Sequence, residues 1–562
     1  MMRHAFIRSM MWLTILLVGS PAAGTPALSA VSVASAPLSA EGEKTAWPER
    51  VHAGATSEHF ALADALPADV SVFVQIERPT AHVDVMRSMP LVQWAESHLS
   101  AEAVGPVWKE LARTAEISPE QLFRVCFGGR TTFAQRQNPE GRTERMIVLT
   151  IEKRELNRLL RALRPTVRAP RHDAARYELE DHQLHLARRG EQLFVAPLDQ
   201  VGLLDETLHN LSRRADRTLQ SHDAFTHRDE LPAGDVSVFL QHGSFLGGWS
   251  IATAELDGVR IRLTQRSHYE RPPFARAVTA LEIDAAPLSA FERDALLAMI
   301  EPLDIGETRL EVFALAQLGE GLLSPEMRRN LKDRRMLVIG EVEGRQEDPP
   351  ADLQVPTLVM CFEMKSRENA MGPFDQQMVR FVNRLHSLGR GAFALETPEA
   401  RELRDQMPRS IDLSPATIWL TDDLPLMRSV SLNWSIADGP HGSYYVIATH
   451  PNKLRGTVSA LEREGIQPSE VMQKLQSAGF VRGVRMSHHI RSWAEQAELI
   501  AAPGQAEQVA EAASMLADLA VGLDRIKWQM KRPSRQDMLL ELELTLSPPV
   551  TAEDECGSPK KK

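Results

Sequence analysis

Histidine residues are the first candidates for chemistry in this sequence, because imidazole nitrogens bind metals and transfer protons near neutral pH. His488 and His489 are adjacent and shortly precede Trp493. Adjacent residues on a strand face opposite sides, so these two imidazoles are poorly placed to share one metal ion. The spacings of strong zinc motifs are also absent. The pair therefore predicts a polar strand end.

Other histidines gather in the first half of the chain. One lies in the run Arg-His-Asp at 171–173, and His182 and His185 follow it. Asp181 and His185 could share a region, but the alternation of apolar and polar residues over 177–186 favours a hairpin that turns near Asp181. We therefore expect no metal site here.

Nucleophilic side chains lack the neighbours that would activate them. Serine hydrolases often carry Gly-x-Ser-x-Gly. The most similar segment is 242–248, which contains Ser244, but no base for this serine can be identified. Cys126 precedes Phe-Gly-Gly and has no assigned histidine partner. A lone nucleophile without a base is a weak signal, so we predict no catalytic residue.

The cysteines are few. An odd set of Cys126, Cys361 and Cys556 is not a disulfide framework. Cys126 and Cys361 lie in apolar, strand-like runs, and we expect both to be small buried hydrophobic residues. A bridge between these two would need an oxidising compartment and stays open, while Cys556 lies in a polar tail.

Phosphate loops and cofactor motifs are absent from the sequence. The nearest run, 41–45, places Glu43 between the glycine and the lysine and lacks the first glycine of the P-loop pattern. The carboxylate pair Asp422-Asp423 is typical of a solvated turn. The sequence therefore predicts no cofactor, no cofactor-binding residue and no metal ligand.

Aromatic residues gather in the second half, at Trp419, Trp434, Tyr444 and Tyr445. They could line a groove for a glycan or a peptide, because aromatic rings give a large contact area. Alternation along strands directs half of them inward, so core packing is the favoured interpretation.

The first residues have the layout of an export signal. Arg3, His4 and Arg8 precede a short apolar run at 10–18, and small residues follow. The run is short for a membrane span, which needs about 20 residues. An uncleaved N-terminal anchor is the alternative. No later segment approaches a spanning length, so we expect no stable membrane span after signal cleavage.

Composition is that of a globular protein. The chain has 562 residues, is 43% hydrophobic and 25% charged, and carries a net charge of −11. Nucleic-acid binders usually show a basic patch or stripe, so the acidic balance argues against nucleic acid as a partner.

Strand-like and helix-like patterns alternate along the body of the chain. At 70–76 the apolar residues Val70, Val72, Val74 and Ile76 alternate as on one face of a strand. Leucines over 156–163 and apolar residues over 374–388 have helical spacing. Further strands are expected at 146–151, 193–195, 236–240, 259–263, 337–342, 357–362, 418–420, 430–434, 444–448, 526–530 and 538–546, and further helices at 91–111, 201–211 and 506–523.

Three pairs of similar but diverged segments (sequence echoes) indicate an internal duplication. The stretch at 144–153 resembles that at 355–365, and the stretch at 190–198 resembles that at 442–451. The stretch at 257–264 resembles the closing stretch at 536–545. A shorter echo links 66–75 with 231–241. The matching order favours duplication over chance similarity of strand–helix units.

These patterns predict an α+β fold with largely antiparallel sheets, flanking helices and two diverged tandem modules. The expected organisation is a signal peptide at 1–24 with cleavage as late as 36, a flexible lead at 25–60, a first module at 61–285, a second module at 286–548 and a polar tail at 549–562.

One family resemblance accompanies this layout. The opening Leu-Pro-Ala-Asp at 66–69, the strand at 190–195 that leads into a helix, and the paired closing strands follow an export signal. In these features the chain resembles a family of exported bacterial proteins known only as a domain of unknown function. The resemblance covers roughly residues 60–548 and implies export, but neither an activity nor a set of catalytic residues.

The function we expect is that of an extracytoplasmic (periplasmic or secreted), envelope-associated binding or structural protein. Its partner would be an unknown envelope protein or polymer. The alternative is a secreted hydrolase whose site is assembled from residues distant in sequence. A cleft with converging His, Asp or Ser would favour the enzyme, and an exposed strand edge would favour interaction.

Overall fold

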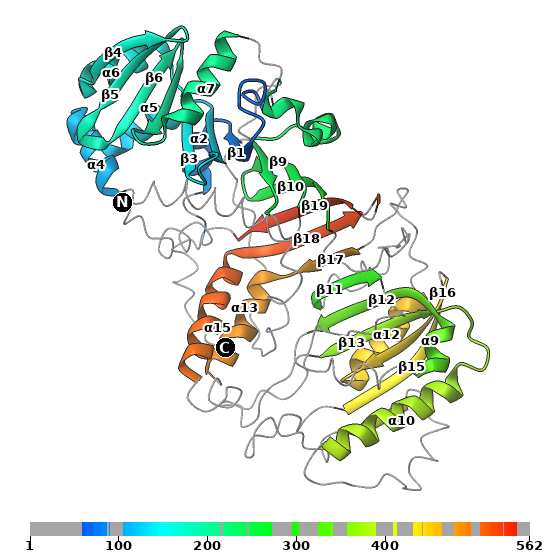
Figure 1. Ribbon diagram of the computed structural model, residues 1–562. Helices are drawn as coiled ribbons and strands as arrows, with labels where there is room; N and C mark the ends of the chain where they lie inside the picture. Colours follow the sequence, from blue (N-terminus) through cyan, green and yellow to red (C-terminus); the bar gives the residue numbers. More distant parts are fainter. Residues whose placement is uncertain are drawn as a thin grey trace, which may run out of the picture. The chain divides into compact units, whose positions relative to one another are not determined.

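The chain forms two compact units in the computed structural model (Figure 1). The structure describes residues 59–86, 89, 105–213, 217–243, 247–271, 295–302, 324–340, 357–388, 409–412, 431–440, 442–463, 477–495, 506–531, 533, 534 and 536–547. Unit 1 contains the described residues up to Arg271 and those from Pro533 onward, and unit 2 contains those from Ala295 to Lys531. The predicted signal peptide, almost all of the lead at 25–60 and the tail at 549–562 lie outside the described residues.

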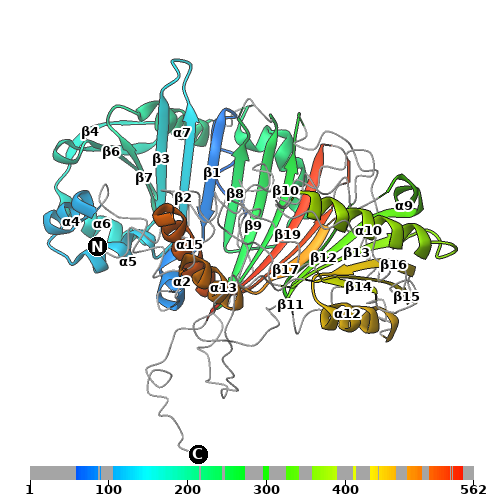
Figure 2. The same cartoon turned by 90° about the horizontal axis from the view of Figure 1, so that it is seen from below.

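Unit 1 is built on an antiparallel sheet with the strand order β4-β5-β6-β7-β3-β2-β1-β8-β9-β10-β19. Figure 2 shows β1, β8, β9 and β10 side by side. The strands are β1 (Val70–Ile76), β2 (Thr131–Gln137), β3 (Thr143–Thr150), β4 (Thr166–Arg171), β5 (Ala174–Leu179), β6 (Leu184–Arg189), β7 (Gln192–Pro197), β8 (Val236–Gln241), β9 (Trp249–Asp257), β10 (Arg260–His268) and β19 (Asp537–Leu546).

The last of these strands comes from the far end of the chain. The sequence places β19 at the end of the predicted second module, whereas in the structure it pairs with β10 in unit 1. All the described residues of unit 2 therefore lie, in sequence, between these two neighbouring strands.

The helices of unit 1 follow local sequence signals. In α6 (Lys153–Leu163) the residues Leu156, Leu159, Leu160 and Leu163 are buried on one face, as their spacing predicts. In α5 (Pro119–Phe127) Ser118 and Gln121 form a reciprocal capping box at the N-terminus. The other helices are α2 (Pro79–Met86), α4 (Gly105–Thr114) and α7 (Val201–Ser212), with short 3-10 helices η2 (Glu180–His182), η3 (Leu219–Ser221) and η4 (Asp223–Glu230).

The core of unit 1 corrects one detail of the prediction. We expected Val70, Val72, Val74 and Ile76 to form the buried face of β1, but Val72 is only half-buried and Phe73 is fully buried. The register shifts between Val70 and Val72. This irregularity breaks the alternation, so Val70 joins Phe73 in the core cluster.

Unit 2 has its own antiparallel sheet, with the strand order β14-β15-β16-β13-β12-β11-β17-β18. Its strands are β11 (Ala295–Pro302), β12 (Leu331–Gly340), β13 (Leu358–Met364), β14 (Arg409–Asp412), β15 (Ser431–Gly439), β16 (Gly442–Ala448), β17 (Ser477–Val481) and β18 (Leu523–Lys531). Its helices are α9 (Pro325–Asn330), α10 (Met371–Leu388), α12 (Pro451–Arg463), α13 (Gly483–Glu495) and α15 (Ala506–Val521).

The predicted α+β class with antiparallel sheets is confirmed in both units. The hairpin expected at 177–186 is present as β5 and β6, joined by a 3-10 turn that includes Asp181 and His182. The helix expected at 506–523 is also present, but its apolar face is less covered than its spacing predicts, because Leu516 is 37% exposed and only Ala517 is buried. The strand predicted at 418–420 lies outside the described residues.

Candidate functional site

The cysteine thiols are buried and unsuited to nucleophilic chemistry. Cys126 lies in α5 and Cys361 in β13, and both are free thiols. Burial raises the pKa of Cys126 to about 12, and burial also raises the pKa of Cys361. A thiol that remains protonated at neutral pH does not act as a nucleophile or a metal ligand. The burial expected for both is confirmed, but the strand expected around Cys126 is wrong, since the capped helix α5 contains it.

The thiols supply a first test. In a Cys556→Ser variant, the native chain should react with a thiol reagent far more slowly than a free cysteine does, and two thiols should appear on unfolding without reductant. Buried, protonated thiols react slowly because the thiolate is the reactive form. Absorbance of a chromogenic disulfide reagent, with and without denaturant, measures both quantities. Rapid native labelling would contradict the burial, and a missing pair of thiols after unfolding would indicate a bridge.

The strand end predicted for His488 and His489 is wrong. Both lie within helix α13, where His489 is buried and His488 is exposed. Burial lowers the pKa of His489 to about 4, and the charge of His488 adds to the effect. His489 is therefore neutral at pH 7. The described part of the chain holds no group of three or more His, Cys, Asp or Glu side chains arranged for a metal ion.

The buried imidazole predicts an acid-dependent loss of stability. The pKa of His489 is about 4 in the folded state and about 6.5 when unfolded. The unfolded state therefore binds more protons between these values, and unfolding becomes easier as pH falls from about 6.5 to about 4, by up to roughly 3 kcal/mol. Denaturant titrations across this range should show a steeper decline for the wild type than for His489→Leu. A His488→Gln variant is the control, and equal slopes for wild type and His489→Leu would contradict the prediction.

His185 lies beside a set of ion pairs around Arg176, and the ring of His172 packs edge-on against that of His209, with 5.0 Å between centroids. The Arg176 guanidinium is buried, donates to Asp205 of α7 and lies 3.3 Å from Nε2 of His185. Asp205 also accepts from Arg171 at 2.8 Å. Burial, followed by the charge of Arg176, lowers the pKa of His185. The carboxylates near His185 are therefore Glu178, 3.7 Å from its Nδ1, and Asp205, and the pairing of Asp181 with His185 considered from sequence does not form.

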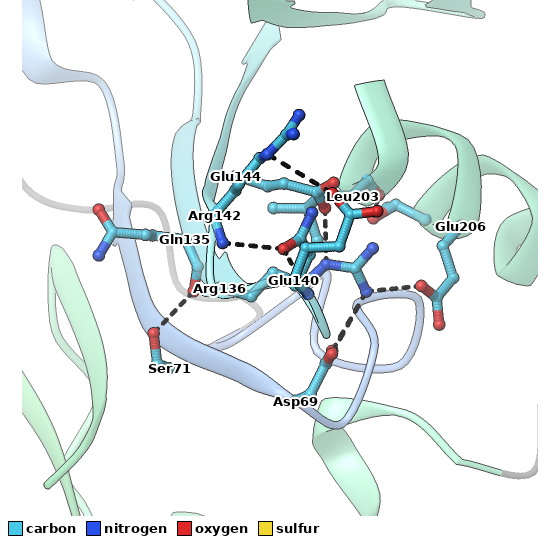
Figure 3. A network of polar contacts seen from close by, with 11 residues as sticks. Asp69, Ser71, Gln135, Arg136, Glu140, Arg142, Glu144, Leu203 and Glu206 are labelled. Carbon is cyan, nitrogen blue, oxygen red and sulfur yellow. Dashed lines mark hydrogen bonds and ion pairs between the residues drawn. The ribbon is translucent and has the colours of Figure 1, made fainter. Parts of the chain in front are cut away.

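A second buried arginine, Arg136 of β2, is held by three carboxylates (Figure 3). Its Nε donates to Glu144 of β3 at 2.8 Å, and its Nη1 donates to Glu206 of α7 at 2.6 Å and to Asp69 at 3.2 Å. Burial alone would lower the pKa of Arg136, but hydrogen bonds to Glu206 and Glu144 raise it above its ordinary value. The contacts join the start of β1, the β2–β3 hairpin and α7.

Gly202 makes room for this cluster in the first turn of α7. A Cβ at Gly202 would lie 2.5 Å from Oε1 of Glu144. The Glu144 carboxylate thus lies against the N-terminal turn of the helix, where unpaired backbone N–H groups favour negative charge. Sequence reasoning missed this cluster, although one signal was present: Arg136 and Glu144 are opposite charges flanking a turn with Asn138 and Gly141.

A serine–histidine contact occurs at one end of the unit 1 sheet. His242 Nε2 lies 2.8 Å from the Ser250 hydroxyl, which lies 2.6 Å from the Ser267 hydroxyl. Gln265 donates to Ser267 at 2.8 Å. Both serines are 0% exposed. Within the described part of the chain no carboxylate forms an ion pair with His242, so the array lacks both access for substrate and an orienting acid. Ser244, the serine singled out from sequence, lies outside the described residues.

Next to this array, Trp249 stacks with two imidazoles. The ring centroids of His227 and His268 each lie 5.8 Å from that of Trp249. His227 contacts Glu230 at 2.7 Å, and His268 contacts Asp537 of β19 at 3.0 Å. Burial would raise the pKa of Asp537, but hydrogen bonds from Ser534 and His268 lower it below its usual value. The contact between His268 and Asp537 therefore links the end of β10 to the start of β19.

The aromatic residues of unit 2 pack in its core. Trp434 and Tyr445 are each 1% exposed, and Tyr444 is also buried. The Trp434 indole donates to Asp375 at 2.8 Å, and the ring of Tyr445 packs edge-on against Phe374. The favoured prediction of core packing is confirmed for these residues, and Trp419 lies outside the described residues.

The outer strand of the unit 1 sheet has a different character. All six residues of β4 are exposed, and Val167 is 73% exposed. Among the described strands only β5 pairs with β4. Arg168 pairs with Glu178 on β5, and Pro170 lies near the end of β4. β4 therefore presents backbone groups and an apolar side chain on an unpaired edge.

No protein-family model matches this chain, and neither a curated protein nor a solved structure was found to be similar to it. Among the described residues, no helix is both long and apolar enough to cross a lipid bilayer. The polar clusters and the open edge of β4 thus carry what can be inferred about function.

Proposed function

We propose that this chain is an exported, envelope-associated protein that binds a protein or polymer partner without catalysing a reaction, and that it consists of two diverged copies of one α+β module. The observation that carries the binding role is the open edge of β4. Unpaired edge strands accept an added strand from a partner, with main-chain hydrogen bonds giving affinity. The exposed Val167 supplies an apolar contact on that strand.

The strand orders of the two units support the duplication. Unit 1 contains the order β5-β6-β7-β3-β2-β1-β8-β9, and unit 2 has β14-β15-β16-β13-β12-β11-β17-β18. Each strand of one list occupies the same position along the chain and the sheet as its counterpart in the other. The helices agree as well, because α6 and α10 follow β3 and β13, while α7 and α12 follow β7 and β16.

The sequence echoes fall on strands that correspond in this comparison. The echo of 144–153 with 355–365 covers β3 and β13, and the echo of 190–198 with 442–451 covers β7 and β16. The third echo covers β10 and β19. Sequence and strand order thus support the same alignment independently. The shorter echo, on β1 and β8, links two neighbouring strands of unit 1 instead.

Export forms the other half of the proposal and rests on the apolar run at 10–18. Mass spectrometry of the protein from envelope fractions should find a mature chain that begins after residue 24 or after residue 36. A cytosolic chain that still begins at Met1 would contradict export. The resemblance to a family of exported bacterial proteins likewise stays a prediction.

Capture of a partner tests the binding role. The mature chain, coupled to resin, is incubated with envelope extract, and the retained protein or polymer is then purified and its affinity measured directly. Val167→Asp should weaken that affinity at least tenfold, because a charge replaces the apolar contact on the open edge. Met515→Asp is the matched control, since Met515 is an exposed apolar residue (49%) of α15. Equal affinities of wild type and Val167→Asp would exclude β4 as the binding edge.

The contact between His242 and Ser250 defines the alternative of a secreted hydrolase. Turnover of a generic ester or peptide substrate by the mature chain, abolished in Ser250→Ala, would favour this alternative. The complete burial of Ser250 supports the binding role instead, because a nucleophile must reach its substrate.

A further inference from the structure

The edge of unit 1 opposite β4 is formed by β10 and β19. Their antiparallel ladder runs from Arg260 opposite Thr545 to His268 opposite Asp537. In sequence these strands are separated by all the described residues of unit 2, and they are also the closing strands of the two proposed modules. Two equivalent strands therefore pair with each other.

The register of this ladder is symmetric with respect to the duplication. The run Val-Arg-Ile-Arg-Leu-Thr at 259–264 corresponds to Leu-Glu-Leu-Glu-Leu-Thr at 540–545. In this alignment Arg262 corresponds to Glu543, and these two residues are directly opposite each other in the ladder. On either side, Arg260 lies opposite Thr545 and Thr264 lies opposite Glu541. Replacing each residue by its counterpart in the other module converts the first of these pairs into the second. The same relation holds at an interface between two identical subunits related by a twofold axis.

The charges along the ladder have diverged in a complementary way. Arg260 and Arg262 on β10 correspond to Glu541 and Glu543 on β19. The Arg262 Nε donates to Glu543 at 3.2 Å. In a ladder of two identical β10 strands centred on residue 262, Arg262 would lie opposite a second Arg262, and like charges directly opposite are destabilising. Within one chain, the change to Arg and Glu replaces that repulsion with an ion pair.

Around residue 262 the buried face of the ladder is apolar on both strands. Ile261 lies opposite Leu544, and Leu263 lies opposite Leu542. Ile261, Leu263 and Leu544 are buried. An exposed β10 edge would leave part of this apolar surface in contact with water, and burial of apolar surface drives association.

We propose that the outer edge of β10 is a docking edge for the closing strand of a second copy of this module, and that β19 is such a strand joined into the same chain by duplication. This inference rests on the proposed duplication. In the intact chain β19 occupies the edge. When β19 is absent, β10 of a second molecule takes its place, in an antiparallel ladder centred on residue 262.

Disulfide trapping tests the register of that ladder. A chain that ends at Lys531 and carries Arg262→Cys should shift from monomer to dimer in light scattering and form a covalent dimer on mild oxidation. The reason is that directly opposite Cβ atoms lie about 5 Å apart, within reach of a disulfide after small adjustment. Thr264→Cys is the register control. It lies opposite residue 260 of the other copy, so it should cross-link only when mixed with an Arg260→Cys chain.

A synthetic peptide of residues 536–547 supplies β19 in trans and should return the truncated chain to a monomer. A truncated chain that remains monomeric, or that cross-links equally through residues 262 and 264, would overturn the proposal. If truncation prevents folding, the full-length chain with Leu542→Pro and Cys556→Ser keeps its length while proline disrupts β19. The same cross-links are then measured, and the same results support or overturn the proposal. Partner capture uses the intact chain, so either proposal can fail without the other.

Discussion

Replacing Arg136 with methionine should lower the free energy of unfolding by about 3 kcal/mol, because removal of one partner from a buried ion pair leaves an uncompensated charge. The charge left behind is the carboxylate of Glu144, whose side chain is 10% exposed. Glu206 and Asp69 lose the same partner, but their side chains are 48% and 53% exposed, so water compensates them. Denaturant unfolding followed by circular dichroism measures the loss.

Two further variants identify the cause of that loss. Glu144→Gln in the Arg136→Met background should recover part of the stability, because it removes the buried charge and keeps the shape of the side chain. Arg142→Ala is the surface control. Arg142 and Glu140 form a pair with side chains 78% and 68% exposed, and exposed pairs contribute about 0–1 kcal/mol. If Arg142→Ala cost as much as Arg136→Met, burial would not be the reason.

Elements with local signals were predictable from sequence. The leucines of α6 have a helical spacing, and the hairpin of β5 and β6 has alternating residues around a short turn. Both signals lie within a few residues of the structure that they specify. The capping box at Ser118 and Gln121 was equally local and would have predicted the helix that contains Cys126.

Helix α13 was missed because its buried face is not apolar. Gly483, Ser487 and Ile490 are buried at helical spacing, but only Ile490 is a large apolar residue. A Cβ at Gly483 would lie 2.1 Å from the carbonyl oxygen of Leu523, so the glycine permits a close approach of the backbone at the start of β18. Close packing through small residues produces no hydrophobic periodicity. The two histidines in this segment were therefore assigned to a strand.

The polar clusters were beyond local reasoning for a different reason. Arg136 binds residues that are 8, 67 and 70 positions away in sequence, and only the nearest, Glu144, lies in the same hairpin. The partner of His268, Asp537, is 269 positions away. Such contacts depend on which strands become neighbours. In this fold both neighbours of β1, and the neighbour β19 of β10, come from distant segments.

The second large effect is expected in unit 2, where Trp434→Ala should cost about 3–5 kcal/mol of unfolding free energy. Trp434 is among the largest fully buried side chains, and truncation of a buried tryptophan leaves a cavity in addition to the lost apolar burial. The substitution also removes the indole donor of Asp375. Circular dichroism is the appropriate probe, because the substitution changes tryptophan fluorescence.

Conservative variants separate packing from the hydrogen bond. Trp434→Phe keeps most of the ring volume and loses the indole N–H, so we expect a smaller cost of about 1–2 kcal/mol. Asp375→Asn keeps an acceptor for the indole and should lower the free energy of unfolding by less than Trp434→Phe does. Met515→Ala, at an exposed apolar position of α15, should change stability by no more than about 0.5 kcal/mol. If Trp434→Ala were as mild as Met515→Ala, Trp434 would not be part of the core, and an aromatic binding groove would again be the better interpretation.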